Sequence, residues 1–264
     1  MSRILLKVEY DGTAYAGWQR QSNALAVQQV LEEALLSACG HPVTVTGSSR
    51  TDAGVHALAQ MVHFDTTASI PPDKYPFVLN NLLPPDIRVQ SGRAVPPDFH
   101  ARFLCSGKTY EYRFLLARHG SALRRNTHWH IPVPLAREPM VESVSTLTGA
   151  HDFAAFQAAG GTAKTTLRTL SSAELSFAGD EAVFRVSGDA FLYNMVRIIA
   201  GTLVEIGLGK RGPDAFSRAF ASLNRLDLGM TAPPHGLTLV DVRYPDAAFT
   251  APESIRWAEP VPPR

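Results

Sequence analysis

Residues 190–206 constrain the fold of this chain more than any other segment. Their sequence, AFLYNMVRIIAGTLVEI, is apolar on nearly every face of a helix, a pattern that indicates burial in the middle of a core rather than at a surface. The segment is shorter than the roughly 18 apolar residues that a membrane span requires. With 264 residues, of which 45% are hydrophobic, the chain is long enough to surround this helix with one large domain or two ordinary ones.

Arg197 is the anomaly of this segment. A guanidinium keeps its charge in a protein, and burying it costs several kcal/mol unless a carboxylate or a phosphate meets it. Alternatively, Asn194, Arg197, Gly201 and Glu205, spaced by three and four residues, form the solvent-facing stripe of an amphipathic helix. The pattern alone leaves both interpretations open.

Hydrophobic periodicity predicts strands and helices in alternation along the chain. Expected strands cover residues 3–10, 43–47, 58–64, 87–89, 109–116, 167–177, 182–187 and 237–244. Expected helices cover residues 25–39, with Glu32 and Glu33 opposite its apolar stripe, and residues 73–82, 138–147, 190–206 and 214–223. Such interleaving is typical of mixed α/β (α+β) folds with helices packed on one side of the sheet.

The order of these elements suggests two similar α/β halves, although no strict repeat is visible in the sequence. We expect an N-terminal half over residues 1–104 and a C-terminal half over residues 105–264. The proline-rich tail over residues 252–264 is expected to be poorly ordered.

The charge balance excludes a general polyanion binder. The 25 basic and 24 acidic residues give a net charge of +1, so any surface for nucleic acid must be local. Only five of the basic residues are lysines, which leaves 20 arginines. Arginine binds phosphate with two parallel hydrogen bonds and stacks on bases, but an arginine-favouring genome explains the same bias.

Cysteine usage and hydropathy narrow the class of protein further. Cys39 and Cys105 lie far apart without a CxxC spacing, so neither a disulfide framework nor a cysteine zinc site is indicated. No long apolar segment follows the first residues, as a secretory signal would require. We therefore expect a cytoplasmic protein that does not enter a membrane.

The segment over residues 46–57, TGSSRTDAGVHA, is the least core-like stretch beside a predicted strand. Polar loops held by strands are where a rigid scaffold presents reactive groups. The segment offers the Asp52 carboxylate close to the Arg50 guanidinium; a carboxylate can act as nucleophile or base, and a neighbouring cation keeps it ionised. A plain turn, in which Asp52 caps its own backbone, explains the same residues.

Other residues could contact a nucleic acid. Tyr110 and Tyr112 share one face of a predicted strand and suit either core packing or base stacking. Basic residues in two predicted loops could reach phosphates, although loop charges are commonly just solvated; they are Arg118, His119, Arg124, Arg125, Lys164 and Arg168. His128 and His130 have the spacing of a pair of metal ligands, but no third ligand lies in register.

Several motifs together resemble the tRNA pseudouridine synthase A family. They are VEYDGTAYAGWQRQ, SSRTDAGVHALAQMVHFDT, KTYEYRF, HDFAAF, AFLYNMVRIIAG and GLTLVDVRYP, in this order over almost the whole chain. The resemblance implies a pseudouridine synthase fold with two similar α/β halves and a central RNA-binding cleft, and a homodimer. It also implies an isomerase that converts uridine to pseudouridine at positions 38, 39 and 40 in the anticodon stem-loop of tRNA, without metal or organic cofactor.

The resemblance also implies roles for individual residues. Asp52 matches the catalytic aspartate of the family, Arg50 and Tyr110 its active-site arginine and tyrosine, and Arg197 the basic partner of the aspartate. We therefore expect Arg197 to pair with Asp52 and keep it deprotonated. Lys164 and Arg168, with Arg118, Arg124 and Arg125, are expected to bind the RNA backbone.

Two positions depart from the family pattern. Ser49 precedes Arg50 where glycine is usual, so it must adopt the backbone geometry of glycine or shift the loop. Gln157 stands where many members carry arginine, which affects one expected RNA contact. Two other functions remain compatible with the residues: a non-catalytic protein that binds structured RNA, and a metal-dependent hydrolase built on His128 and His130.

Overall fold

The computed structural model describes residues 1–250 of the chain, which build one ten-stranded mixed sheet. Along the sheet the strands follow the order β4-β1-β3-β10-β5-β9-β8-β7, while β2 pairs with β3 and β6 pairs with β5. The strands are β1 (Ser2–Tyr10), β2 (Thr46–Gly47), β3 (His56–Thr66), β4 (Ile87–Val95), β5 (Gly107–Leu115), β6 (Trp129–His130), β7 (Gly149–Asp152), β8 (Leu167–Ala178), β9 (Glu181–Gly188) and β10 (Leu237–Arg243).

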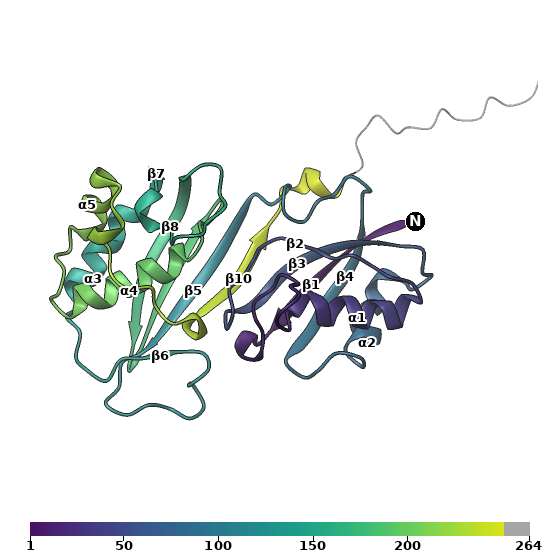
Figure 1. Ribbon diagram of the computed structural model, residues 1–264, viewed down its shortest axis with the longest axis horizontal. Helices are drawn as coiled ribbons and strands as arrows, with labels where there is room; N and C mark the ends of the chain where they lie inside the picture. The colour runs from purple at the N-terminus through teal and green to yellow at the C-terminus, as the bar shows by residue number, and fades with distance from the viewer. Residues whose placement is uncertain (251–264) are drawn as a thin grey trace, which may run out of the picture.

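The strand β10 joins the two parts of the sheet. It lies between the strands of residues 1–104 and those of residues 105–250 (Figure 1). Thr238 and Leu239 pair in parallel with His56 and Ala57 of β3, whereas β10 pairs with β5 in antiparallel fashion over most of its length. The junction to the first half therefore rests on a short parallel ladder.

Five helices cover one face of this sheet. They are α1 (Val27–Cys39), α2 (Tyr75–Leu79), α3 (Arg137–Val144), α4 (Met195–Gly207) and α5 (Ala215–Ser222). The helices α1 and α2 lie over the first half, and α3, α4 and α5 lie over the second (Figure 1). Buried residues of all five helices belong to one continuous apolar core with Leu6 and Val8 of β1 and Tyr112 of β5. On the opposite face, Leu5 packs in a small separate cluster with Phe99.

The most apolar segment starts its helix later than its composition predicts. Helix α4 begins at Met195, because Asn194 adopts the left-handed conformation (φ 61°) directly before it. Asparagine tolerates this conformation better than most side chains. As a result, Phe191 precedes the helix and its ring packs edge-on against Tyr110.

Most other predicted elements are present, with local differences. The predicted helix over residues 73–82 is shorter, since only Tyr75–Leu79 is α-helical, and the strand expected over residues 43–47 is reduced to Thr46–Gly47. The expectation that Glu32 faces solvent is wrong. Its buried carboxylate accepts hydrogen bonds from Val45 N (3.1 Å) and from Gln28 Nε2 (3.0 Å), so it serves as an internal acceptor.

The division at residue 104 remains a prediction, because the described residues form one continuous sheet and one main core. Within residues 1–250, no helix is long and apolar enough to cross a membrane. The expectation of a poorly ordered tail over residues 252–264 concerns residues outside those that the structure describes.

Candidate active site

The loop that carries Asp52 is fixed by the first strand and by the segment that follows it. Tyr10 at the end of β1 shares a hydrogen bond with Thr51 Oγ1 (2.7 Å), and Trp18 N donates to Thr51 O (3.0 Å). Gly17 (φ 89°) lies against this loop, where a Cβ would come within 2.5 Å of Thr51 O. The backbone next to Asp52 is thus restrained by the hydrogen bonds of Tyr10 and Trp18 to Thr51 and by the close packing of Gly17.

Arg197 reaches Asp52 from the other half of the chain. Its Nη1 lies 3.2 Å from Asp52 Oδ2, and the side chains of Arg197 and Asp52 are 15% and 26% exposed. The same guanidinium donates to Asn194 Oδ1 (2.6 Å) and, through Nε, to Ala232 O (2.8 Å). Arg197 is therefore a paired, largely buried cation rather than part of a solvent-facing stripe; Gly201 of that proposed stripe is buried as well, against Met230 O.

The ionisation of Asp52 depends on two opposing effects. Burial raises the pKa of the Asp52 carboxyl above its ordinary value, and the charge and hydrogen bond of Arg197 oppose that rise. Desolvation is the larger effect here, since it penalises the charged form of the carboxyl. Arg197 thus favours the ionised form without lowering the pKa below its usual range, which is a weaker effect than the sequence argument assumed.

Tyr110 of β5 lies beside this pair. Its side chain is buried, its ring packs edge-on against Phe191 at a centroid distance of 5.0 Å, and its hydroxyl is 2.7 Å from Ser49 Oγ. Burial raises the pKa of the Tyr110 phenol to about 12, an effect to which the charge of Asp52 adds and which the hydrogen bond to Ser49 opposes. The phenol is therefore neutral at physiological pH.

The structure brings Asp52, Arg197 and Tyr110 together, whereas the other predicted site residues lie further out on the surface. Arg50, two residues before Asp52, has an exposed side chain, and so has Lys164. Arg168, in β8, is partly buried, and its Nε atom has no hydrogen-bond partner among residues 1–250. Gln157 Oε1 likewise has no hydrogen-bond partner among residues 1–250.

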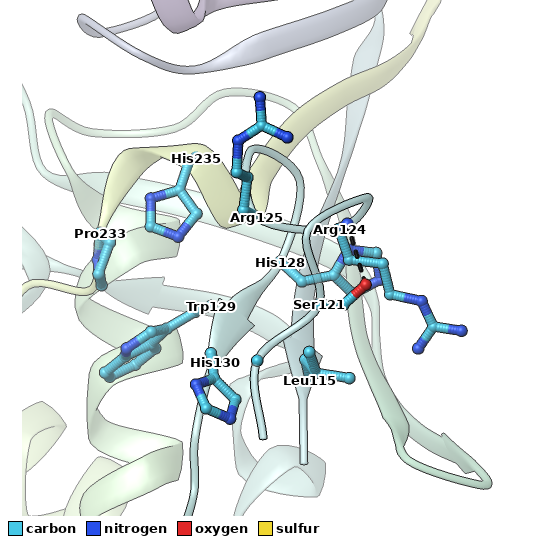
Figure 2. A pocket seen from close by; sticks show the side chains of 10 residues that line it. Leu115, Ser121, Arg124, Arg125, His128, Trp129, His130, Pro233 and His235 are labelled. Atoms are coloured by element: carbon cyan, nitrogen blue, oxygen red, sulfur yellow. Dashed lines mark hydrogen bonds between the residues drawn. The ribbon is translucent and has the colours of Figure 1, made fainter. Parts of the chain in front are cut away.

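A cavity of about 430 Å³ opens beside the loop that links β5 to β6 (Figure 2). Arg124 and Arg125 stand on this loop, and His128 and His130 line the cavity with His235 (Figure 2). His128 Nε2 lies 2.9 Å from Glu181 Oε1, and His130 Nε2 donates to Ala117 O (2.7 Å). Both rings are thus held by protein groups, and residues 1–250 contain no group of three side chains arranged to bind a metal.

Sequence reasoning missed the residues that hold the site from behind. Gln60 is completely buried in β3, where its Oε1 accepts from Ser49 N (3.1 Å) and its Nε2 donates to Ser49 O (2.7 Å). Its position among apolar residues of a predicted strand was the available signal, because a buried amide requires partners. Asn194 and Ala232, which hold Arg197, gave no comparable signal.

Of the two expected consequences of Ser49, the structure tests only the first, a backbone conformation that favours glycine; the shift of the loop stays a prediction. Ser49 is absent from the residues with positive φ among those described, so it does not need the backbone freedom of glycine. The hydroxyl of this serine instead contacts Tyr110.

Comparison with known proteins places this chain in a family. Residues 7–104 and 144–245 match the family model described as tRNA pseudouridine synthase. The chain is 45% identical over 245 residues to tRNA pseudouridine synthase A of Ruminiclostridium cellulolyticum, an alignment that covers 92% of this chain and 100% of that protein. The protein of the same name from Acetivibrio thermocellus is 43% identical, with 92% and 100% covered, and that from Halalkalibacterium halodurans is 47% identical, with 90% of each chain covered. The chain therefore belongs to the tRNA pseudouridine synthase A family and is an isomerase that acts on tRNA.

Proposed function

We propose that this enzyme converts uridine to pseudouridine at positions 38, 39 and 40 in the anticodon stem-loop of tRNA, with Asp52 as its catalytic residue. The observation that carries the proposal is the 3.2 Å contact between Asp52 Oδ2 and Arg197 Nη1, made between two distant parts of the chain beside the buried phenol of Tyr110. The positions within tRNA come from the resemblance of the sequence motifs to the family.

The reaction requires an ionised carboxylate. The bond between N1 and C1′ breaks, the uracil rotates while bound, and C5 joins C1′ and then loses its proton, while N1 ends with a hydrogen. Asp52 can attack C1′ directly or abstract a proton from the sugar, which gives a glycal, and both routes start from the charged carboxylate. Neither route transfers electrons to an external acceptor, so the proposal includes no cofactor.

Arg197 has two tasks in this scheme. Its charge opposes the effect of burial on the Asp52 carboxyl, which maintains the reactive form near neutral pH. Its hydrogen bonds to Asn194 and Ala232 fix the guanidinium and thereby the direction in which the carboxylate points. A preorganised charge of this kind needs little rearrangement during the reaction.

A paired uridine must leave the helical stack before it reaches Asp52, at a cost of a few kcal/mol. The flipped uracil would pack on Tyr110, whose hydroxyl lies at the site and could relay the C5 proton. Arg50, with its exposed planar guanidinium, suits the vacated stack or the adjacent phosphate.

The RNA backbone would be bound by cations around the site, mostly through shape rather than sequence. Arg124 and Arg125 flank the cavity of Figure 2, while Lys164 and Arg168 lie before and in β8. Arg118 lies on the same loop as Arg124, which contacts Asp180 at the turn between β8 and β9, whereas Lys164 and Arg168 lie at the opposite end of β8, so the proposed contacts fall on two separate basic patches. We further propose a homodimer, as the resemblance implies, located in the cytoplasm, as the hydropathy of the sequence predicts.

Replacement of the catalytic carboxylate tests the proposal. Asp52→Asn should abolish release of tritium from tRNA that carries 5-³H-uridine, because the amide can neither attack nor abstract a proton, while tRNA affinity measured by filter binding stays within a few-fold of the parent. Asp65→Asn is the matched control, since Asp65 is also paired with an arginine, at 2.7 Å, but at the far end of β3; it should retain turnover.

Two results would contradict the proposal. Turnover by Asp52→Asn would remove the catalytic assignment. If the parent binds tRNA but leaves every uridine unmodified in carbodiimide labelling, the chain is an RNA-binding protein without this activity. Mapping the labelled sites tests positions 38, 39 and 40 individually.

A further inference from the structure

Ser49 and Tyr110 form a hydrogen bond that connects the two halves of the chain at the candidate site. Ser49 Oγ lies 2.7 Å from the Tyr110 hydroxyl oxygen. The serine follows β2 in the first half, and the tyrosine lies in β5 of the second. Among residues 1–250, this bond is the one side-chain hydrogen bond between residues 46–57 and β5, the strand that carries the phenol.

The Ser49 hydroxyl is held in place by its own backbone. The fully buried amide of Gln60 accepts from Ser49 N and from Ser48 Oγ (2.8 Å), and donates to Ser49 O. Both backbone groups of Ser49 are thereby anchored to β3, and the hydroxyl has only rotation about one side-chain bond left. Such anchoring holds a short side chain in one direction.

The phenol of Tyr110 needs a fixed partner because it is buried. A hydroxyl in an apolar environment is costly without a hydrogen bond, and the edge-on contact with Phe191 restrains only the ring plane. Among the described residues, Ser49 Oγ is the side-chain atom that hydrogen-bonds with the phenol oxygen. Rotation of the ring about its long axis does not move this oxygen, but tilting of the side chain does. The bond to Ser49 restrains that tilt and so fixes the position of the oxygen relative to Asp52.

The geometry points to Ser49 as a positioning residue for Tyr110. The Ser49 hydroxyl holds the phenol oxygen of Tyr110 at the place where this oxygen meets the flipped uracil. This inference rests on the proposed function, in which Tyr110 contacts the substrate. It assigns the effect to the hydroxyl group of Ser49 and not to the size of the side chain. Loss of the bond should therefore slow the chemical step while tRNA binding remains intact.

Three variants separate the hydroxyl from the volume of the side chain. Ser49→Ala removes the group and Ser49→Cys retains its size with a much weaker hydrogen bond, whereas Ser49→Thr keeps a hydroxyl. Loss of one neutral hydrogen bond predicts a decrease of about fivefold in the single-turnover rate of tritium release for Ala and Cys. Thr should retain at least about half of the parental rate, and KM should change less than about twofold in all three.

The matched control is Ser187→Ala. Ser187 Oγ hydrogen-bonds to Thr109 Oγ1 at 2.8 Å in the interior, one residue from Tyr110 along β5 but on the opposite face of the sheet. This variant loses the same type of bond to the same strand. It should lower the midpoint of urea unfolding without changing the rate of tritium release.

The outcomes distinguish this inference from the proposed function. Three results would each overturn the inference: parental turnover by Ser49→Ala, an increase in KM alone, or a folded Ser49→Thr that is as slow as Ser49→Ala. In each case, loss of turnover by Asp52→Asn, measured in parallel, would still support the catalytic role of Asp52. Turnover by Asp52→Asn overturns the proposed function itself. Urea unfolding shows whether each variant is folded. If Ser49→Ala is unfolded, Ser49→Cys provides the test of the missing hydroxyl.

Discussion

Replacing Arg197 with methionine tests the electrostatic basis of the candidate site. Methionine keeps much of the length and apolar volume of the arginine stem but removes the charge. The substitution eliminates the 3.2 Å contact with Asp52 and the hydrogen bonds to Asn194 Oδ1 and Ala232 O. The carboxylate is left without its cation, and a carbonyl and an amide lose a donor.

The contacts set the size of the expected effect on stability. Removing one partner of a buried ion pair costs about 3–5 kcal/mol. Because the side chains of Arg197 and Asp52 retain 15% and 26% exposure, water can reach the stranded carboxylate, and we expect the lower end, about 3 kcal/mol. In a protein of this size, that loss corresponds to a decrease of about 6–12 °C in Tm.

The expected effect on activity depends on pH. Burial already raises the pKa of Asp52, and Arg197 opposes the rise, so the variant should have a still higher pKa and a smaller ionised fraction near neutrality. At pH 7, kcat/KM should fall by about 100-fold or more, and the acid limb of the rate profile should move to higher pH. The loss of stability should shrink in acid, because a carboxyl with a raised folded-state pKa favours the folded state when it is protonated.

Arg211→Met is the matched control for this experiment. Arg211 pairs with Glu205 of α4 at 2.6 Å, with exposures of 24% and 20%, and donates to two backbone carbonyls. Its loss should lower Tm similarly and leave the tritium-release profile unchanged. Parental activity of Arg197→Met at pH 7, or an acid limb that stays in place, would refute the reasoning about Asp52.

Two further predictions concern the scaffold. Gly17→Ala should destabilise the protein by about 1–3 kcal/mol, measured by urea unfolding, and reduce turnover, because the residue has φ 89° and its Cβ would collide with Thr51 O; a stable, fully active variant would show that the loop is not packed tightly. Arg3→Met should lower the midpoint of urea unfolding at pH 7, and lower it less below about pH 4. The hydrogen bonds of Arg3 lower the pKa of Asp65, and the stabilisation that they give is lost as the pH falls through this lowered pKa. An equal loss at both pH values would contradict this explanation.

Periodicity predicted the parts of the fold that depend on local sequence. The strand β1 and helix α1 lie within a residue or two of the expected ranges, and Gly40 ends α1 in the left-handed conformation (φ 74°) as its type suggests. The start of α4 was missed because it depends on the conformation of a single residue, Asn194. No periodicity encodes such a turn, and tertiary contacts such as the packing of Phe191 on Tyr110 select it.

The residues alone made the candidate site predictable only in part, and its members were assigned from the resemblance to the family. A lone arginine in an apolar segment required either an acidic partner or a place on a solvent-facing stripe. The resemblance to the family paired it with Asp52, and the structure shows this contact. The direction of the Asp52 pKa shift was not predictable, since it depends on how far water is excluded from the carboxyl. The contacts of Ser49 with Tyr110 and Gln60 were equally hidden, because they join residues far apart in sequence through distances that only the assembled sheet fixes.

The place of β10 has a consequence for biosynthesis. Until residues 237–243 leave the ribosome, neither β3 nor β5 has the neighbour that lies between them in the finished sheet, and each nascent lobe presents an unpaired edge that can associate with other chains. Asp52 and Arg197 emerge earlier, yet the strand that holds their lobes together is translated after both. A polypeptide that stops before β10 would therefore be inactive and prone to aggregate, so that competence for tRNA modification requires residues 237–243 to have been translated.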